Sequence, residues 1–224
     1  MMCKTVVSIF VLAVFVCSLP AEEGPRDEQK EKLKCANLVY AGSKSSVCFS
    51  DKFLDTVQRE TNCDTERKFT KVRLATDEMF QYPFAIMTGE GAFSLLETER
   101  QILKSYLDRG GFLLASAGCS STEWDRSFRR EMQRIFPNKT LEKVELSHPI
   151  FHTVFDVKRI QLKKGGSSGH LLGLQIDGKI VLIYSPEGLN DTAHAGKKCC
   201  CCGGNEIKNS MEINVNIFTY ALTH

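Results

Sequence analysis

The 224-residue sequence lacks three features that would each place it in a broad class of proteins. Charge of one sign is not in excess, because 29 Lys and Arg residues stand against 27 Asp and Glu residues. This balance does not favour nucleic acid or an anionic membrane as a partner. Beyond the N-terminal segment no apolar run approaches the roughly 20 residues that span a bilayer, and no internal repeat is present. The chain that follows this N-terminal segment is therefore expected to contain no transmembrane segment.

The first 21 residues have the organisation of a secretory signal peptide. Lys4 supplies a positive charge, residues 6–16 are largely apolar, and small residues precede Glu22. Residues 22–32 are charged and show no apolar period, which is typical of a linker. We expect a signal peptide over 1–21, a charged linker over 22–32 and a single domain over 33–224. After cleavage the protein is expected to be exported, either periplasmic or secreted.

Cysteines are numerous and unevenly spaced. Eight of the ten follow the signal segment, an even number that suits disulfides in an oxidising compartment, and Cys48 with Cys63 is the first expected pair. Four are adjacent, at positions 199–202. Adjacent side chains point in different directions and cannot all face one core. The run therefore indicates a metal site, a cluster of disulfides or reactive thiols.

Hydrophobic patterns after residue 33 alternate between strand and helix types. Ser94 with Glu97 predicts a capping box for a helix that ends at Gly110. Asp177-Gly178 between two apolar segments is a strong hairpin signal. Strands are predicted over 36–40, 69–74, 83–87, 112–117, 171–176 and 179–184, and helices over 51–59, from 94 to 109, between 119 and 137, and over 213–222. This order predicts an α/β domain with a mostly parallel sheet, helices on both faces and a late antiparallel hairpin.

Two loops that follow predicted strands have the composition of a ligand site, because open α/β sheets bind ligands beyond the carboxyl ends of their strands. In the first, residues 88–91, two glycines let backbone N–H groups approach a ligand closely. The second, residues 118–121, places Cys119 at a strand-to-helix turn, where a helix dipole favours a thiolate. Alternatively, the glycines only permit a turn and Cys119 is a small buried residue.

This arrangement resembles class I glutamine amidotransferase-like domains, whose flavodoxin-like sheet carries a glycine loop after one strand and a cysteine after the next. Those enzymes have a His-Pro-Glu sequence after a late strand, whereas this chain has Ser185-Pro186-Glu187. A serine hydroxyl cannot accept a thiol proton at neutral pH. The resemblance implies a ligand site without the usual base. Its expected members are Thr88, Gly89, Glu90, Gly91, Gly118 and Ser185.

A closer resemblance, from about Leu33 to His224, is to a family of bacterial domains of unknown function, number 4159. It rests on short segments that occur in order, namely 82–84 with 88–89, 110–114 ahead of Cys119, 128–129 with 136–137, 148–151, 183–186 and 216–222. The family implies an exported or membrane-associated amidotransferase-like fold. It implies no established activity.

Two functions stand as alternatives for the strand ends. A non-catalytic binding or structural module, with an unknown small molecule or protein as its partner, is favoured by Ser185 in the place of a base. A cysteine-dependent hydrolase would use Cys119 as nucleophile, His194 as base and Glu187 as the residue that orients the base.

The cysteine run adds a third alternative, a metal site. Cys119, His194, Cys199 and Cys202 would form a tetrahedral set for zinc, which accepts thiolate and imidazole together. A second separated Cys-x-x-Cys, which would strengthen the zinc interpretation, is not present in the sequence. Disulfides from the run to Cys35 or Cys119 are the structural alternative.

Overall fold

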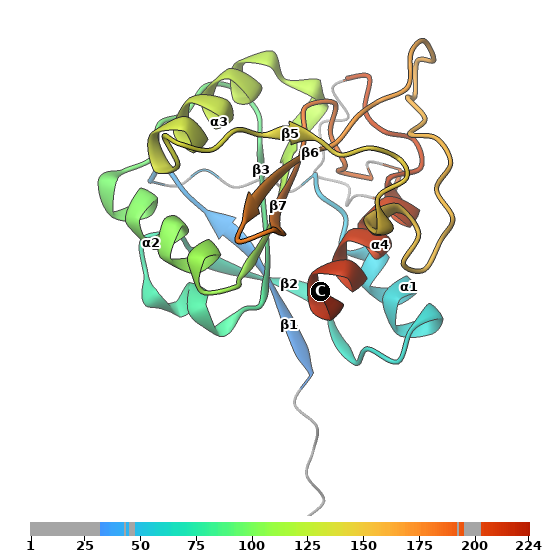
Figure 1. Cartoon of the computed structure of the whole chain (residues 1–224), viewed down its shortest axis with the longest axis horizontal. Helices are drawn as coiled ribbons and strands as arrows, with labels where there is room; N and C mark the ends of the chain where they lie inside the picture. Colours follow the sequence, from blue (N-terminus) through green and yellow to red (C-terminus); the bar gives the residue numbers. More distant parts are fainter. Residues whose placement is uncertain (1–31, 43, 45–47, 192, 195–202) are drawn as a thin grey trace, which may run out of the picture. The chain divides into compact units, whose positions relative to one another are not determined.

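The apolar runs of the sequence fold as the strands of one seven-stranded sheet. The computed structural model describes residues 32–224 except 43, 45–47, 192 and 195–202, and the part of the chain from Lys32 to His224 is a compact unit. The spatial order of the strands is β2-β1-β3-β4-β7-β6-β5 (Figure 1). Their bounds are β1 Leu33–Val39, β2 Thr65–Arg73, β3 Phe84–Gly89, β4 Phe112–Ala117, β5 Glu142–Lys143, β6 Leu172–Ile176 and β7 Lys179–Ser185.

The pairing of the strands is parallel from β2 to β7 and antiparallel from β7 to β5. β3 and β4 are buried along their whole length, as expected for continuous apolar strands that are covered on both faces. Gly89 pairs with Ala117, and Ser116 pairs with Ser185. The carboxyl ends of β3, β4 and β7 therefore meet at one edge of the sheet.

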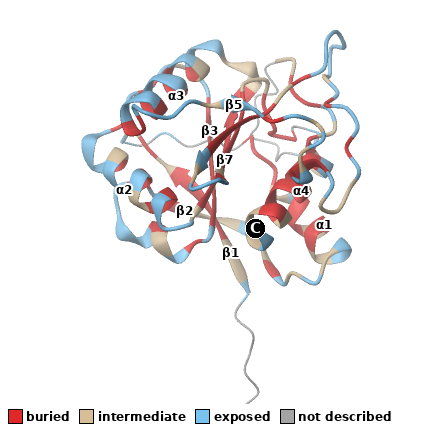
Figure 2. Cartoon of the chain, in the orientation of Figure 1, coloured by how far each residue is buried: buried red, intermediate tan, exposed pale blue. Residues whose placement is uncertain are grey.

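Helices cover both faces of this sheet. They are α1 (Lys52–Glu60), α2 (Glu97–Asp108), α3 (Thr122–Ile135) and α4 (Ser210–Thr223). Figure 1 shows α2 and α3 on one face and α1 and α4 on the other. Each helix turns its buried side toward the sheet (Figure 2). Two apolar clusters result, one on each face of the sheet.

Aromatic side chains mark the centre of each cluster. On the α3 side, Trp124 and Phe128 stack with their ring centroids 5.0 Å apart. On the other side, Phe53 from α1 and Phe218 from α4 meet edge to face at 6.1 Å. Offset and edge-to-face pairs of this kind are the arrangements that aromatic rings prefer.

The predicted fold class is confirmed as a mixed α/β domain with a mostly parallel sheet and a late antiparallel hairpin. At the hairpin, Asp177 and Gly178 have φ values of 50° and 78°, as a two-residue turn requires.

The predicted capping box of Ser94 and Glu97 is wrong. Helix α2 begins at Glu97, where the Leu96 N–H donates to the Glu99 carboxylate (2.8 Å). The two-residue strand β5 was not predicted.

The segments that precede the domain lie almost entirely outside the described residues. This applies to the predicted signal peptide and to the predicted linker up to residue 31. Within the described residues, every helix is too short or too polar to cross a membrane.

Candidate functional site

Three loops meet at the edge where the parallel strands end. The loops after β3 and β4 are joined by Ser121, whose Oγ accepts a hydrogen bond from Gly91 N (3.1 Å). The loop after β7 reaches the same place, because Ser120 Oγ donates to Glu187 O (2.7 Å). The two loops predicted to form a ligand site therefore lie side by side.

Cys119 occupies the turn from β4 to α3 in a left-handed backbone conformation. Its φ and ψ are 53° and 28°, and Ser120 follows with φ 54°. Left-handed conformations cost non-glycine residues roughly 1–2 kcal/mol each. Two in succession persist only where the surroundings hold them, and such strain is frequent at functional sites.

Carboxylates surround Cys119. Its Sγ lies 3.3 Å from Glu90 Oε1, and its backbone N–H donates to Glu206 Oε1 (3.2 Å). Glu206 is buried and pairs with Lys163 Nζ through its other oxygen (3.1 Å). Negative charge beside a sulfur opposes the thiolate that a nucleophilic cysteine requires. The charge around Cys119 therefore differs from that of a typical activated cysteine.

A buried set of hydrogen bonds holds the loop after β7 against the strand ends. Asn190 Oδ1 accepts from Ser116 Oγ (2.7 Å) and from Thr88 Oγ1 (3.2 Å). Ser116 Oγ in turn accepts from Leu189 N (2.8 Å), and Ser185 Oγ accepts from Gly188 N (3.0 Å). All three hydroxyl side chains are fully buried. They position the loop that covers them.

Four of the six predicted ligand-binding residues lie inside the protein. Thr88, Gly89, Gly118 and Ser185 are buried, whereas Glu90 is exposed and Gly91 is half-buried. Thr88 and Ser185 are hydrogen-bonded to the loop over 187–191, so a ligand could reach these two only if that loop moved. Their role as ligand contacts stays a prediction.

The predicted base and its orienting residue have other partners. Glu187 Oε1 pairs with His170 Nδ1 (2.8 Å), and His194 Nδ1 pairs with both carboxylate oxygens of Asp191 (3.0 Å each). His170 was not predicted at this site. It precedes β6 and Glu187 follows β7, so an antiparallel hairpin brings the two positions together. The hairpin signal in the sequence could have suggested this pair.

Asp191 is a buried carboxyl in a left-handed conformation (φ 51°). Burial raises its pKa, against the opposing effects of the hydrogen bond from His194 and of the charge on Lys163. Asp and Asn tolerate this backbone conformation better than most residues.

The segment over 203–207 lies across the Cys119 turn. A Cβ atom placed on Gly204 would stand 2.3 Å from the carbonyl carbon and oxygen of Cys119, so glycine permits this close approach. Ile207 N donates to Gly188 O (3.0 Å), and Ile207 also pairs with Leu162. The strand ends are thus covered by two segments of the chain itself, 187–191 and 203–207, which we call the cover.

Two of the four residues of the predicted zinc set belong to the described part of the chain. Cys119 and His194 are described, whereas Cys199 and Cys202 lie outside the described residues. Within the described part of the chain, no three His, Cys, Asp or Glu side chains are grouped so that they could hold a metal ion. The expected pair of Cys48 and Cys63 is wrong, because neither residue takes part in a disulfide, and the same holds for Cys35.

A family model described as a domain of unknown function, DUF4159, matches residues 35–222, which is most of the chain. The chain belongs to this family. A comparison with curated proteins found no match.

In the DUF4159 domain, several segments that suggested the family join the loops to α4. Asn216 Oδ1 on α4 accepts from Val154 N (3.0 Å) and Phe155 N (2.8 Å). His148 Nδ1 accepts from Ile150 N (3.2 Å) and thereby caps the short helical turn Pro149–Phe151. These residues stabilise the α4 side of the domain.

Proposed function

We propose that this DUF4159 domain is an exported, non-catalytic binding or structural module on a degenerate amidotransferase-like fold. One observation carries the proposal: the chain supplies its own partner for the backbone N–H of Cys119. In a catalytic turn such an N–H group is free to face a substrate oxygen. Here it donates to the buried carboxylate of Glu206.

The hydroxyl groups at the edge support the same conclusion. Thr88, Ser116 and Ser185 use their hydrogen bonds to fix the loop over 187–191. A substrate would have to displace this loop and the Glu206 carboxylate together, at the cost of several buried hydrogen bonds. The edge is better suited to stability than to turnover.

The test is an assay of the purified mature protein and of the Cys119→Ser variant against glutamine and small amides. We expect no turnover above the buffer rate in either protein. Cys63→Ser is the matched control, because Cys63 is a free, half-buried thiol far along the chain from the turn. Turnover that is lost in Cys119→Ser and kept in Cys63→Ser would overturn the proposal.

We further propose that Cys119 is held by a disulfide to one of Cys199–Cys202. Gly204 packs against the Cys119 backbone. Cys202 is two residues from Gly204, and two residues span at most about 7 Å, so the cysteine run ends close to the Cys119 backbone. A disulfide requires Cα atoms roughly 4.4–6.8 Å apart, a distance that this short connection allows. The other described cysteines, Cys35, Cys48 and Cys63, take part in no disulfide.

Peptide mapping without reduction tests this link, with metal analysis of the same sample. We expect the peptide that contains Cys119 to be joined to the peptide over 199–202, with no stoichiometric metal. Bound zinc released together with free thiols would instead support the metal site of Cys119, His194, Cys199 and Cys202.

A second candidate, a cysteine-dependent hydrolase active after reduction, is favoured by one observation, the pair of strained residues at the turn. In this version Glu187 would orient His170, its observed partner, in place of His194. Iodoacetamide labelling of the reduced protein near pH 7 decides the matter. Labelling of Cys119 no faster than that of Cys63 would exclude this candidate.

A further inference from the structure

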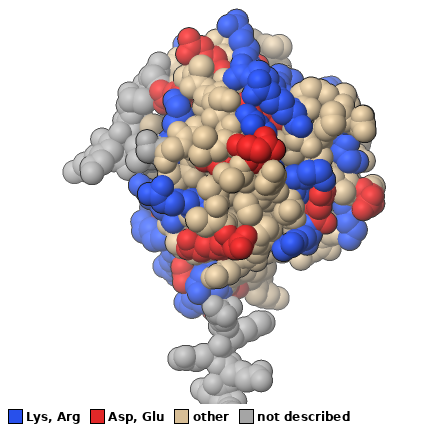
Figure 3. Space-filling model, turned by 90° about the vertical axis from the view of Figure 1, so that its left-hand side faces the viewer, with Lys and Arg blue, Asp and Glu red and all other residues tan. Residues whose placement is uncertain are grey.

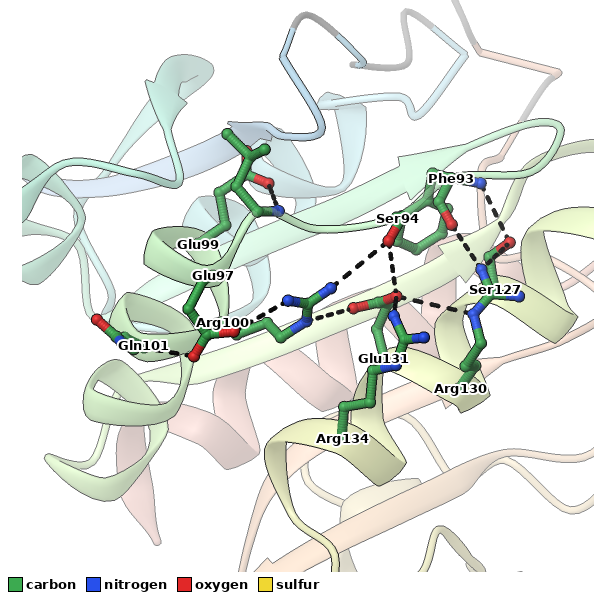
Figure 4. Close-up of polar contacts among 11 residues, drawn as sticks. Phe93, Ser94, Glu97, Glu99, Arg100, Gln101, Ser127, Arg130, Glu131 and Arg134 are labelled. Carbon is green, nitrogen blue, oxygen red and sulfur yellow. Dashed lines mark hydrogen bonds and ion pairs between the residues drawn. The ribbon is translucent and has the colours of Figure 1, made fainter.

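A fully buried carboxylate joins α2 and α3 on the face of the sheet that these helices cover. The side chain of Glu131, on α3, is 0% exposed and accepts hydrogen bonds from Arg100 Nε on α2 (2.8 Å) and from Arg134 Nη1 (2.9 Å) (Figure 4). Ser94 Oγ donates to it at 3.3 Å, and Arg130 Nε lies 3.8 Å away. One guanidinium would balance the charge of one carboxylate. Three gather here, so positive charge is left over.

A groove of about 280 Å³ opens beside this carboxylate, between the outer sides of the two helices. It is lined by Glu97, Arg100, Gln101, Lys104, Arg134 and Ile135. Arg100 and Lys104 are one turn apart on α2, and Arg134 approaches from α3. The Arg134 side chain is 50% exposed, and its bond to Glu131 uses one of the five N–H donors of a guanidinium.

We propose that this groove binds the oxyanion group, a carboxylate or a phosphate, of a small organic molecule. A guanidinium held in place by a buried carboxylate presents its remaining donors with little loss of side-chain freedom, and its planar fork matches both oxyanions. Ile135 and Gln101 offer an apolar and an amide contact for the rest of the molecule. The site is independent of the strand ends and of the function proposed for them.

Glu97 at the rim is the group that such a ligand would displace. Its side chain is 71% exposed and bonds Arg100 Nη1 at 3.1 Å. Across this side of the molecule, Lys and Arg side chains are interspersed with Asp and Glu (Figure 3). Attraction of an anion is therefore a property of the groove and not of this whole face.

The test is a titration of the mature protein with inorganic phosphate and, separately, with malonate, followed by NMR of the backbone amides and arginine Nε–H groups. Sodium chloride at matched ionic strength is the reference. We expect saturable shifts at Gln101 and Arg134 with at least one of the two probes. The probe that binds more tightly identifies the preferred oxyanion.

Variants of opposite expected sign separate a ligand site from a purely structural clamp. Arg134→Gln should weaken binding about tenfold, the loss of one charge-assisted contact. Glu97→Gln should strengthen binding several-fold, because it removes the competing carboxylate. Lys179→Gln, at an exposed position in the β6–β7 hairpin, should change nothing.

Shifts that sodium chloride reproduces, or an affinity that neither Arg134→Gln nor Glu97→Gln alters, would overturn the proposal. If Arg134→Gln perturbs the fold, Glu97→Gln still decides, because Glu97 is exposed and its replacement leaves the buried pair of Arg100 and Glu131 intact.

Discussion

Gly188 lies in the loop over 187–191, where the backbone passes close to the end of β4. Its φ is 105°, and an added Cβ would stand 2.5 Å from Ala117 O. We predict that Gly188→Ala lowers the free energy of unfolding by about 2–4 kcal/mol in urea denaturation, through backbone strain and displacement of the loop. Gly178→Ala is the matched control. Gly178 has φ 78° and open space in the described structure, so it should lose only about 1 kcal/mol. Equal losses would show that the contact with Ala117 is unimportant.

Asp191 gives a prediction of pH dependence. Burial raises its pKa in the folded protein, so its contribution to stability is fully present below the unfolded-state pKa and is lost as pH rises through the folded-state pKa. Asp191→Asn, which stays neutral and tolerates a positive φ, should therefore be more stable than the parent at pH 7. We expect a gain of about 1 kcal/mol, or roughly 2–4 °C in Tm. The gain should disappear below about pH 3.9. A lower Tm at pH 7 would mean that the contact with His194 outweighs burial.

At the scale of elements, sequence patterns predicted what depends on local or repeated signals. The continuous apolar run over 112–117 is β4, and the hairpin formed around Asp177-Gly178. Strand β5 has two exposed residues, and so it carries no hydrophobic pattern from which it could be predicted.

The candidate site was predictable only as far as the order of strands determines it. Convergence of the loops after β3 and β4 follows from parallel pairing, and it was predicted. The partners of individual side chains were not, because they depend on the path of long segments. Glu206 lies 87 residues from Cys119 in the sequence and accepts a hydrogen bond from its backbone N–H. The sequence pattern around Glu206 does not indicate this role.

The clamp between α2 and α3 gives a prediction about helix packing. Removal of the Glu131 carboxylate leaves Arg100 and Arg134 without their shared partner at a buried position. We predict that Glu131→Ala lowers the free energy of unfolding by about 2–4 kcal/mol in urea denaturation. Glu97→Ala, which removes an exposed partner of Arg100, should stay within about 0.5 kcal/mol of the parent. Similar effects of the two variants would contradict a special role for the buried carboxylate.

At the scale of the whole molecule, the sheet with its helices and the cover over the strand ends are stabilised in different ways. The sheet and its four helices bury two continuous apolar clusters, to which the cover over the strand ends contributes Leu189 and Ile207. The rest of the cover is held by hydrogen bonds and by ion pairs such as that of Glu206 with Lys163. Segments with few apolar contacts open locally at a lower free energy than the core does. The cover is therefore expected to be the first described part of the domain to open.

Hydrogen exchange of the reduced protein, followed by mass spectrometry, tests this order of opening. Glu206→Ala removes the acceptor of Cys119 N and the partner of Lys163 while the apolar core stays intact. Peptides over 117–121 and 203–209 should then exchange at least about tenfold faster, the effect of roughly 1.4 kcal/mol, while peptides from β3 and β4 keep the parent rate. Glu212→Ala, at an exposed position in the first turn of α4, is the control and should leave all four regions unchanged. If exchange in the Glu206→Ala variant rises equally in the cover and in the central strands, the cover and the sheet open as one cooperative unit. In that case the cover is part of the core of the domain and does not open separately.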